Sequence, residues 1–385
     1  MDTNAVTLEE LEQLLNHTPL IADIHPVSLC FLPEDVTVLD SASEAAWLLD
    51  DPEPNLPQRV LISTSDLAYR GRFPRVQCEH DPFTPQLNTI LFDHFDDVAA
   101  RMLCQSQIAE RIVSQAQQCN VVALFLVDGL SYRDARDWAD ASAQTLTIEP
   151  CLVDVPTVTT VAFPNLIGDP PLAARLFDLG FHHRLGFTYW TREDNQLTDR
   201  LFHTIADVRK VGDFPQILAT LRRHLSSAGQ RRSYIQIVRT GLDGYAHGQK
   251  RRPPIAAIVA EVHQEFESLA TLCNELRLRA CLYLTADHGI LWRDEFEPEI
   301  AGGAPGKSSP RWCGWRDLYH QRDKGRRFLI DGEEYYCLGF PKLRRSLRID
   351  EQGVHGGISF QESIAPFICR TVDLSADPDQ RLTHL

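Results

Sequence analysis

The sequence lacks any uninterrupted apolar run that approaches the ~20 residues a membrane-spanning helix needs. Its first residues, MDTNAVTLEELEQLL, have neither the basic start nor the apolar core of a secretory signal, so we expect a cytoplasmic protein with no membrane partner. None of the ten cysteines forms a C-x-x-C pair, which argues against a cysteine zinc site or a disulfide framework. Buried, reduced thiols are therefore the prediction.

Positive charge is also scarce. A net charge of -15 excludes a protein that coats nucleic acid through a broad basic surface. The basic residues are nevertheless clustered, and only five of the 38 are lysine, whereas arginine is the better bidentate partner for phosphate. These clusters are either solvated faces or the rim of a site for a polyanionic substrate. They are Arg222, Arg223, Arg231 and Arg232, then Lys250 to Arg252, Lys324 to Arg327, and Lys342 to Arg348.

The length of 385 residues allows one large α/β domain with insertions, or two ordinary domains. We expect residues 1–118 to form an accessory α/β region of unreadable role, and residues 119–385 to form the main domain. The accessory region carries no chemical motif. Its expected elements are helices over Leu8–Leu15 and about Phe95–Gln117, and strands over Val36–Leu39 and Val60–Ser63.

The stretch VVALFLVDGLSY, from Val121 to Tyr132, predicts a strand buried on both faces that ends at Asp128. In open parallel sheets the carboxyl ends of the strands face the ligand crevice. Asp128 is therefore either a ligand of a functional site or a cap for the helix that follows.

Two further apolar strands end in residues suited to bind metal. Tyr234–Val238 leads to Asp243 and His247, four residues apart, and Ala280–Thr285 leads to Asp287 and His288. Carboxylate and imidazole groups together suit zinc or manganese. His355 lies between glycines, which allow the backbone to pass close to a site.

The segment PTVTT predicts a helix whose first turn contains Thr159 or Thr160. A threonine hydroxyl becomes a nucleophile when a metal or a base removes its proton, and the free N–H groups of a helix N-terminus favour an incoming phosphate. A strand end or a simple N-cap is the alternative. Residues of about 172–230 and 290–354 show no regular pattern and are expected to be cap insertions.

The ordered set D, P-T-x-T, D-x-x-x-H, D-H-G and H-G-G resembles the alkaline phosphatase superfamily, in particular its nucleotide pyrophosphatase/phosphodiesterase-like and PglZ-type members. The phrases TADHG and GVHGGISFQE are the most specific. The resemblance implies a doubly wound, mostly parallel α/β sheet over about residues 121–370. It also implies two divalent metal ions, zinc or manganese, of which one is held by Asp243, His247 and His355 and the other by Asp128, Asp287 and His288.

The same resemblance makes Thr159 the nucleophile, with Thr157 and Thr160 as alternatives of register. Asn165, Asn195 and Arg133 are candidates for binding the phosphoryl oxygens. The implied activity is hydrolysis of nucleotide or oligonucleotide phosphodiesters. The alternatives are a phosphomonoesterase or phosphomutase, or a PglZ-type structural or regulatory component with protein partners in a phage-defence or signalling assembly.

Overall fold

The computed structural model describes three short strands near the N-terminus and, from residue 84 onward, residues 84–135, 138, 146–190, 195–228, 231–248, 250–301, 309–314, 325–330 and 332–372. The chain divides into two compact units, Met1–Met102 and Leu103–Leu385. None of the described helices is long and apolar enough to cross a membrane.

In the first unit a parallel sheet has the strand order β1-β3-β2. The predicted strands at Val36–Leu39 and Val60–Ser63 correspond to β2 and β3, whereas the expected helix over Leu8–Leu15 lies outside the described residues. The elements are β1 (Leu20–Ala22), β2 (Thr37–Leu39), β3 (Val60–Ser63), α5 (Thr84–Asp93) and α6 (Phe95–Arg101).

The helix expected over Phe95–Gln117 is interrupted. After α6 the chain forms a two-residue strand, β4 (Leu103–Cys104), and then α7 (Gln105–Gln115) and the 3-10 turn η1 (Ala116–Gln118). Cys104 is the N-cap of α7. It has an extended conformation and its backbone N–H donates to the Gln107 side chain, so a capping box begins a new helix at this point. The apolar face of α7 packs on the main sheet, which explains why the units divide after Met102 and not near residue 118.

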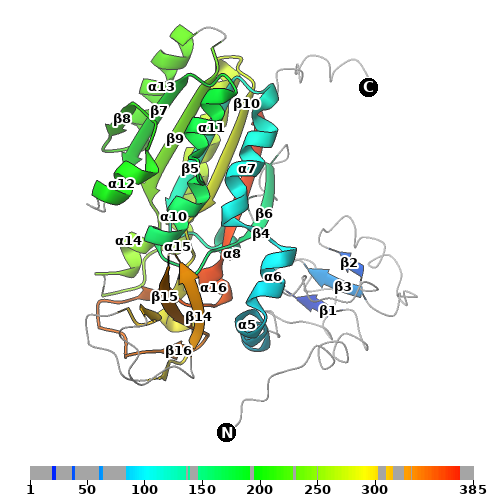
Figure 1. The fold of residues 1–385 in the computed structure, drawn as a ribbon, viewed down its shortest axis with the longest axis vertical. Coiled ribbons are helices and arrows are strands. Elements are labelled where there is room, and N and C mark those ends of the chain that lie inside the picture. The colour runs from blue at the N-terminus through cyan, green and yellow to red at the C-terminus, as the bar shows by residue number, and fades with distance from the viewer. Residues whose placement is uncertain are drawn as a thin grey trace. The chain divides into compact units, whose positions relative to one another are not determined.

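The second unit contains a central sheet of eight strands in the order β4-β6-β18-β10-β5-β9-β7-β8, of which only β18 runs antiparallel to the rest (Figure 1). This is the mostly parallel α/β sheet that the sequence predicts. The strands are β5 (Val121–Asp128), β6 (Leu146–Leu152), β7 (His183–Tyr189), β8 (Asp207–Lys210), β9 (Ser233–Thr240), β10 (Ala280–Ala286) and β18 (Ile364–Val372).

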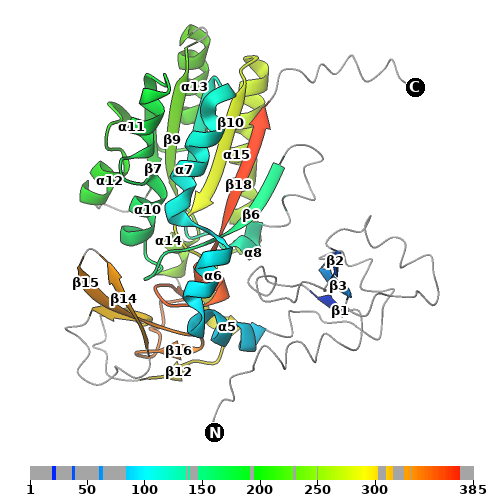
Figure 2. The same ribbon diagram turned by 45° about the vertical axis from the view of Figure 1, so that its right-hand side comes forward.

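Helices cover both faces of this sheet (Figures 1 and 2). One apolar cluster joins the sheet to α7, α10 (Thr159–Ile167), α11 (Leu172–Asp178) and α12 (Asn195–Leu201). The other joins it to α8 (Tyr132–Ala135), α13 (Phe214–Ala228) and α15 (Ile255–Glu275). β5 and β10 are buried along their whole length because residues of both faces are covered, which is why they are continuously apolar.

The prediction of a cap insertion at 172–230 is wrong. This segment supplies β7 and β8 to the central sheet and three of its covering helices. β7 was hidden because it begins with His183 and Arg184, which are only partly buried near the sheet edge, so it lacks a continuous apolar run.

The segment 290–354 does form small structures apart from the central sheet. These are the pairs β11 with β17 and β12 with β16, and the three-stranded sheet β13-β15-β14. The elements are β11 (Leu291–Trp292), η2 (Arg293–Glu295), β12 (Glu299–Ile300), β13 (Trp312–Gly314), β14 (Gly325–Ile330), β15 (Glu333–Leu338), β16 (Lys342–Leu343) and β17 (Gly353–Val354), followed by α16 (Phe360–Ser363).

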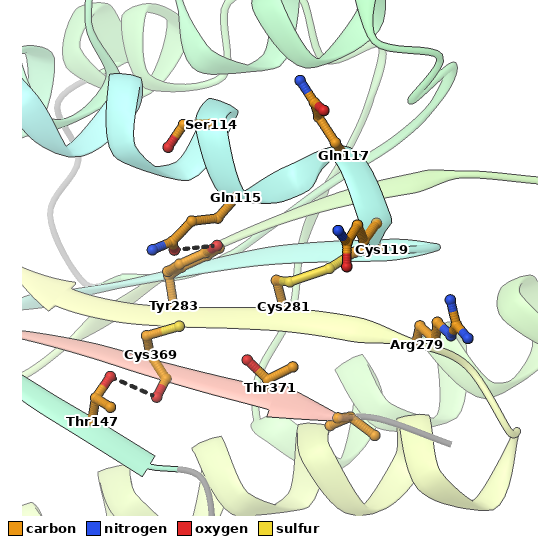
Figure 3. Close-up of a pocket in the computed structure, with 12 residues that line it drawn as sticks. Ser114, Gln115, Gln117, Cys119, Thr147, Arg279, Cys281, Tyr283, Cys369 and Thr371 are labelled. Carbon is orange, nitrogen blue, oxygen red and sulfur yellow. Dashed lines mark hydrogen bonds between the residues drawn. A yellow bond between two sulfur atoms is a disulfide. The ribbon is translucent and has the colours of Figure 1, made fainter. Parts of the chain in front are cut away.

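A cavity of about 640 Å³ lies at the amino ends of β5 and β10 (Figure 3). Cys119 and Cys281 are joined there by a disulfide, which corrects the expectation that all cysteines are reduced. The pair could not be foreseen because 162 positions separate the two cysteines, and only the parallel pairing of β5 with β10 brings them together. Tyr283 donates a hydrogen bond to Gln115 across the same cavity.

Candidate metal and phosphoryl-transfer site

Three neighbouring parallel strands, β9, β5 and β10, bring the predicted acidic residues together at their carboxyl ends. Asp128 ends β5, Asp287 follows β10 directly, and Asp243 begins the short helix α14 (Asp243–Ala246) after β9. The register pairs Asp128 with Thr240. A Cβ atom on Gly241 would lie 2.3 Å from the Asp128 carbonyl oxygen, so this close approach requires glycine.

A deep cluster consists of Asp128, Asp287 and His288, all buried, with ligand atoms within 4.8 Å of one another. Asp287 Oδ1 accepts hydrogen bonds from the backbone N–H groups of Gly129 and His288, at 2.9 and 3.0 Å. Its Oδ2 is buried, lies 3.4 Å from His288 Nε2, and accepts no hydrogen bond from the described residues. A buried carboxylate oxygen without a donor is costly, and a cation would satisfy it.

An outer cluster consists of Asp243, His355 and again His288. His355 Nε2 lies 3.1 Å from Asp243 Oδ1, and the rings of His288 and His355 stack with centroids 4.0 Å apart. The structure therefore places His288 between the two clusters, where the sequence assigned His247 to the outer one. His247 is half-exposed and contacts the same oxygen of Asp243 at 3.3 Å.

Both clustered histidines present the same nitrogen to the site. His288 Nδ1 lies 3.0 Å from the Gly289 carbonyl and His355 Nδ1 lies 2.9 Å from the Thr157 carbonyl. A carbonyl oxygen can only accept a hydrogen bond, so each neutral ring carries its hydrogen on Nδ1. The lone pair of Nε2 then points toward the carboxylates. This arrangement, with the far nitrogen tied to a carbonyl, is the usual outer shell of a metal-binding histidine.

The charges of the cluster shift the pKa of three groups. Burial, assisted by the nearby Asp243 charge, raises the pKa of Asp287 to about 6. Burial disfavours a charge on His355, but the attraction of the neighbouring Asp243 carboxylate exceeds this effect and raises the pKa of His355 to about 9. Burial also disfavours the Asp243 charge, yet His355 and His247 hold the pKa of Asp243 well below its ordinary range. Without a cation, a proton on His355 balances the carboxylates.

The threonines of P-T-x-T have three different environments. Thr159 is the first residue of α10 and is buried, with Oγ1 3.5 Å from Asp128 Oδ1 and 3.4 Å from His288 Nε2. Thr157 Oγ1 instead accepts from Gly356 N–H at 2.8 Å and donates to the Gly357 carbonyl at 3.1 Å. Thr160 is exposed. Only Thr159 therefore directs its hydroxyl to the deep cluster.

Two residues that sequence reasoning missed hold the deep cluster in place. Trp190 follows β7 and donates its indole N–H to Asp128 Oδ2 at 2.6 Å, which fixes the orientation of the carboxylate whose Oδ1 faces Thr159. Gln105, fully buried at the start of α7, donates to the backbone carbonyls of Ala286 and Asp287 at 3.0 and 2.8 Å. The rule that found Asp128 would have found Trp190 had β7 been recognised.

The glycine and glutamate of the HGG-x-S-x-x-E motif have structural partners. Glu362 accepts from Gly357 N–H at 3.0 Å and forms two hydrogen bonds with the fully buried Arg311, at 3.0 and 2.6 Å. Arg311 also donates to the carbonyls of Gly339 and Lys342. This buried pair ties the segment 290–354 to the turn that carries His355.

The candidates for binding phosphoryl oxygens are engaged elsewhere. Asn165 donates to Asp154 at 3.0 Å, and Arg133 donates to Glu295 at 2.5 Å. The side chain of Asn195 lies outside the described part of the structure. The cavity in front of Thr159 and His355, of about 400 Å³, is lined instead by Arg345 and Arg348.

No family model matches the chain. No curated protein matches it either. The solved structures that it resembles include murine ectonucleotide pyrophosphatase/phosphodiesterase 5, at 10% identity and a TM-score of 0.44 over 65% of this chain and 87% of that one. Phosphonoacetate hydrolase from Sinorhizobium meliloti is 13% identical, with a TM-score of 0.41 over 65% of this chain and 90% of that one. The C-terminal periplasmic domain of a phosphoethanolamine transferase from Campylobacter jejuni is 9% identical, with a TM-score of 0.39 over 66% of this chain and 80% of that one.

At these identities and TM-scores we base the assignment of function on the residues and distances of this chain.

Proposed function

We propose that this protein is a metal-dependent phosphoesterase that cleaves phosphodiesters of nucleotides or oligonucleotides, with Thr159 as the nucleophile. One observation carries the proposal. The Thr159 hydroxyl, at a helix N-terminus, lies within 3.5 Å of both Asp128 Oδ1 and His288 Nε2, two ligand atoms of the deep cluster. Structural threonines satisfy their hydroxyl with backbone groups, as Thr157 does, whereas the Thr159 hydroxyl faces a carboxylate and an imidazole, which are groups suited to hold a cation.

The residues present fit two divalent cations. Asp287 Oδ2 is buried and accepts no hydrogen bond from the described residues. Asp243 Oδ1 faces the Nε2 atoms of His355 and His247, at 3.1 and 3.3 Å, and both clustered histidines direct Nε2 toward the carboxylates. One ion would be held by Asp128, Asp287 and His288. The other would be held by Asp243 and His355, with His247 close enough to be a further ligand. Mixed carboxylate and imidazole ligands favour zinc, and manganese is the alternative. When bound, such ions lower the pKa of a nearby hydroxyl and neutralise phosphoryl oxygens.

The chain's own groups then account for the reaction. The Thr159 hydroxyl loses its proton and its Oγ bonds to phosphorus as one ester P–O bond breaks, and the leaving alcohol takes up a proton. For a nucleotide diester the product is a nucleotidyl-threonine, which water then cleaves to release the nucleoside monophosphate and restore the Thr159 hydroxyl. The N-terminus of α10 offers backbone N–H groups to the phosphoryl oxygens during both steps. Trp190 and Gln105 keep Asp128 and the end of β10 from shifting.

A substrate panel tests the proposal. It contains bis-p-nitrophenyl phosphate, p-nitrophenyl phosphate, linear and cyclic dinucleotides, and single-stranded DNA and RNA, each with added zinc or manganese. We expect diesters to be cleaved faster than the monoester, and chelator to stop the reaction. Activity that persists in a metal-free protein with chelator would refute the metal-dependent mechanism, and a preference for p-nitrophenyl phosphate would make the protein a monoesterase.

A further inference from the structure

The cavity in front of Thr159 has two walls of different origin. One wall belongs to the site, with Thr159, His247 and His355. The other comes from the segment 290–354 and contributes Trp312, Arg345, Arg348 and Glu351 among its lining residues. The volume of about 400 Å³ is in the range of small-ligand sites. The second wall is therefore placed to contact the part of a substrate that does not react.

This wall carries more positive than negative charge, since two arginines line the cavity against one glutamate. Glu351 is nearly fully buried, and each of its oxygens accepts from Arg345 at 2.7 Å. Arg348 is the second cation. Its side chain is 51% exposed, and its nearest carboxylate contacts are long, 3.2 Å to Glu351 and 3.6 Å to Asp350. Arg348 thus retains N–H donors for an anion, and Arg293 holds its backbone carbonyl at 3.1 Å.

An aromatic ring lies on the same wall. Trp312 is partly exposed, and its indole edge covers Gly356, where a Cβ atom would lie 2.2 Å from Trp312 Cδ1. The Trp312 ring also contacts the Tyr335 ring, with centroids 5.6 Å apart. A partly exposed indole that packs against Gly356 and Tyr335 is a suitable surface for a planar base.

The other basic clusters that the structure describes are paired away from this cavity. Arg222 pairs with Glu275, Arg252 with Asp294 and Glu295, and Arg327 with Glu334. Arg232 donates to four backbone carbonyls near the amino end of β5. Among the described residues of the clusters found in the sequence, those of Lys342–Arg348 line the cavity of the site.

We propose that this wall is a subsite for one nucleotide next to the scissile phosphate, with its base against Trp312 and its second phosphate on Arg348. The inference rests on the proposed function and narrows its substrate class to diesters that carry a further phosphate one nucleotide away. A diester on two cations presents only two non-bridging oxygens to them, so the flanking phosphate needs a partner outside the cluster.

Equilibrium binding tests the subsite without turnover. The parent is the zinc-loaded Thr159→Ala protein, and the probes are adenosine 3′,5′-bisphosphate, AMP and ribose 5-phosphate. We expect the bisphosphate to bind about tenfold more tightly than AMP, as one hydrogen-bonded ion pair supplies, and Arg348→Gln to abolish that difference. Trp312→Leu should weaken AMP about tenfold and leave ribose 5-phosphate within about twofold, because only the base is stacked.

Arg222→Gln is the matched control, since it removes an exposed, paired arginine outside the cavity and should change no affinity. If Arg348→Gln preserves the preference for the bisphosphate, the phosphate contact is overturned. If Trp312→Leu weakens AMP and ribose 5-phosphate equally, Trp312 only supports the turn at Gly356, and the base contact is overturned. If the unaltered protein hydrolyses no member of the substrate panel while the binding experiments give the expected pattern, the proposed function is refuted and the nucleotide subsite stands.

Discussion

The two ends of the central sheet each open into a cavity, and the two cavities differ in kind. The one at the amino ends of β5 and β10 is larger, about 640 Å³ against 400 Å³, and its lining is mainly glutamine, threonine and cysteine (Figure 3). At the carboxyl ends, buried carboxylates and imidazoles converge, and Asp287 Oδ2 has no hydrogen-bond donor among the described residues. Size therefore does not identify the site. The convergence of buried carboxylates and imidazoles does, because a bound cation would offset the cost of burying several carboxylates together.

The largest effect is expected from a threonine at the carboxyl end, and a threonine at the amino end is its control. Thr159→Ala removes the hydroxyl beside Asp128 and His288, and should lower kcat on a diester by about ten-thousandfold or more, as for other nucleophiles, while metal content stays unchanged. Thr371→Ala, in the amino-end cavity, should leave kcat unchanged. Steady-state kinetics of both variants measure kcat, and elemental analysis measures their metal content. If Thr157→Ala or Thr160→Ala is the inactive variant instead, the register is wrong but the mechanism survives.

The second prediction concerns pH, to which only the carboxyl-end cavity should respond. Because the pKa of His355 is raised to about 9 from an ordinary value of about 6.5, the folded, metal-free protein keeps its proton between these values. A cation must displace that proton, so metal affinity should fall about tenfold for each pH unit below 9, and activity should fall toward acid pH.

The same proton stabilises the metal-free fold fully below pH ~6.5, and this contribution is lost as pH rises through 9. Metal titrations by calorimetry in two buffers, which count released protons, measure the first effect, and thermal unfolding in chelator measures the second. An affinity that does not change between pH 6.5 and 9 would contradict the assignment of His355 as a ligand.

A smaller effect is expected from the residue that orients Asp128. Trp190→Phe keeps an aromatic ring but removes the N–H donor, and loss of such an outer partner typically costs about tenfold in metal affinity. Phe163→Leu is the control, because it removes the ring that packs edge-on against Trp190 and leaves the hydrogen bond. Competition with a chromophoric chelator gives the affinity. Equal losses in both variants would mean that packing, and not the hydrogen bond, holds Asp128.

The smallest effect on turnover is expected at the amino end. Cys281→Ser breaks the bond to Cys119, and a disulfide spanning 162 positions typically contributes about 2–4 kcal/mol to stability. The variant should unfold at lower denaturant concentration and retain the parent kcat. A large loss of kcat with intact metal content would show that the two ends of the sheet are coupled.

Much of the site follows from local sequence, because buried parallel strands are short apolar runs and their carboxyl ends share one edge. That logic predicts that Asp128, Asp243 and Asp287 lie at one edge of the sheet, and the structure places them at the carboxyl ends of β5, β9 and β10. It did not foresee that His288 lies between both clusters, since this depends on the spacing of β5, β9 and β10. It also missed β7, whose first residues are polar, and the Arg311–Glu362 pair, whose partners are 51 positions apart.

The most direct test of the central claim is anomalous diffraction from crystals grown with zinc, recorded above and below the zinc absorption edge. We predict two peaks per chain at the carboxyl end of the sheet, one among Asp128, Asp287 and His288 and one beside Asp243 and His355, and loss of the first in Asp287→Ala. Diffraction that shows no zinc at these residues, or zinc only at other residues, would contradict the two-metal site.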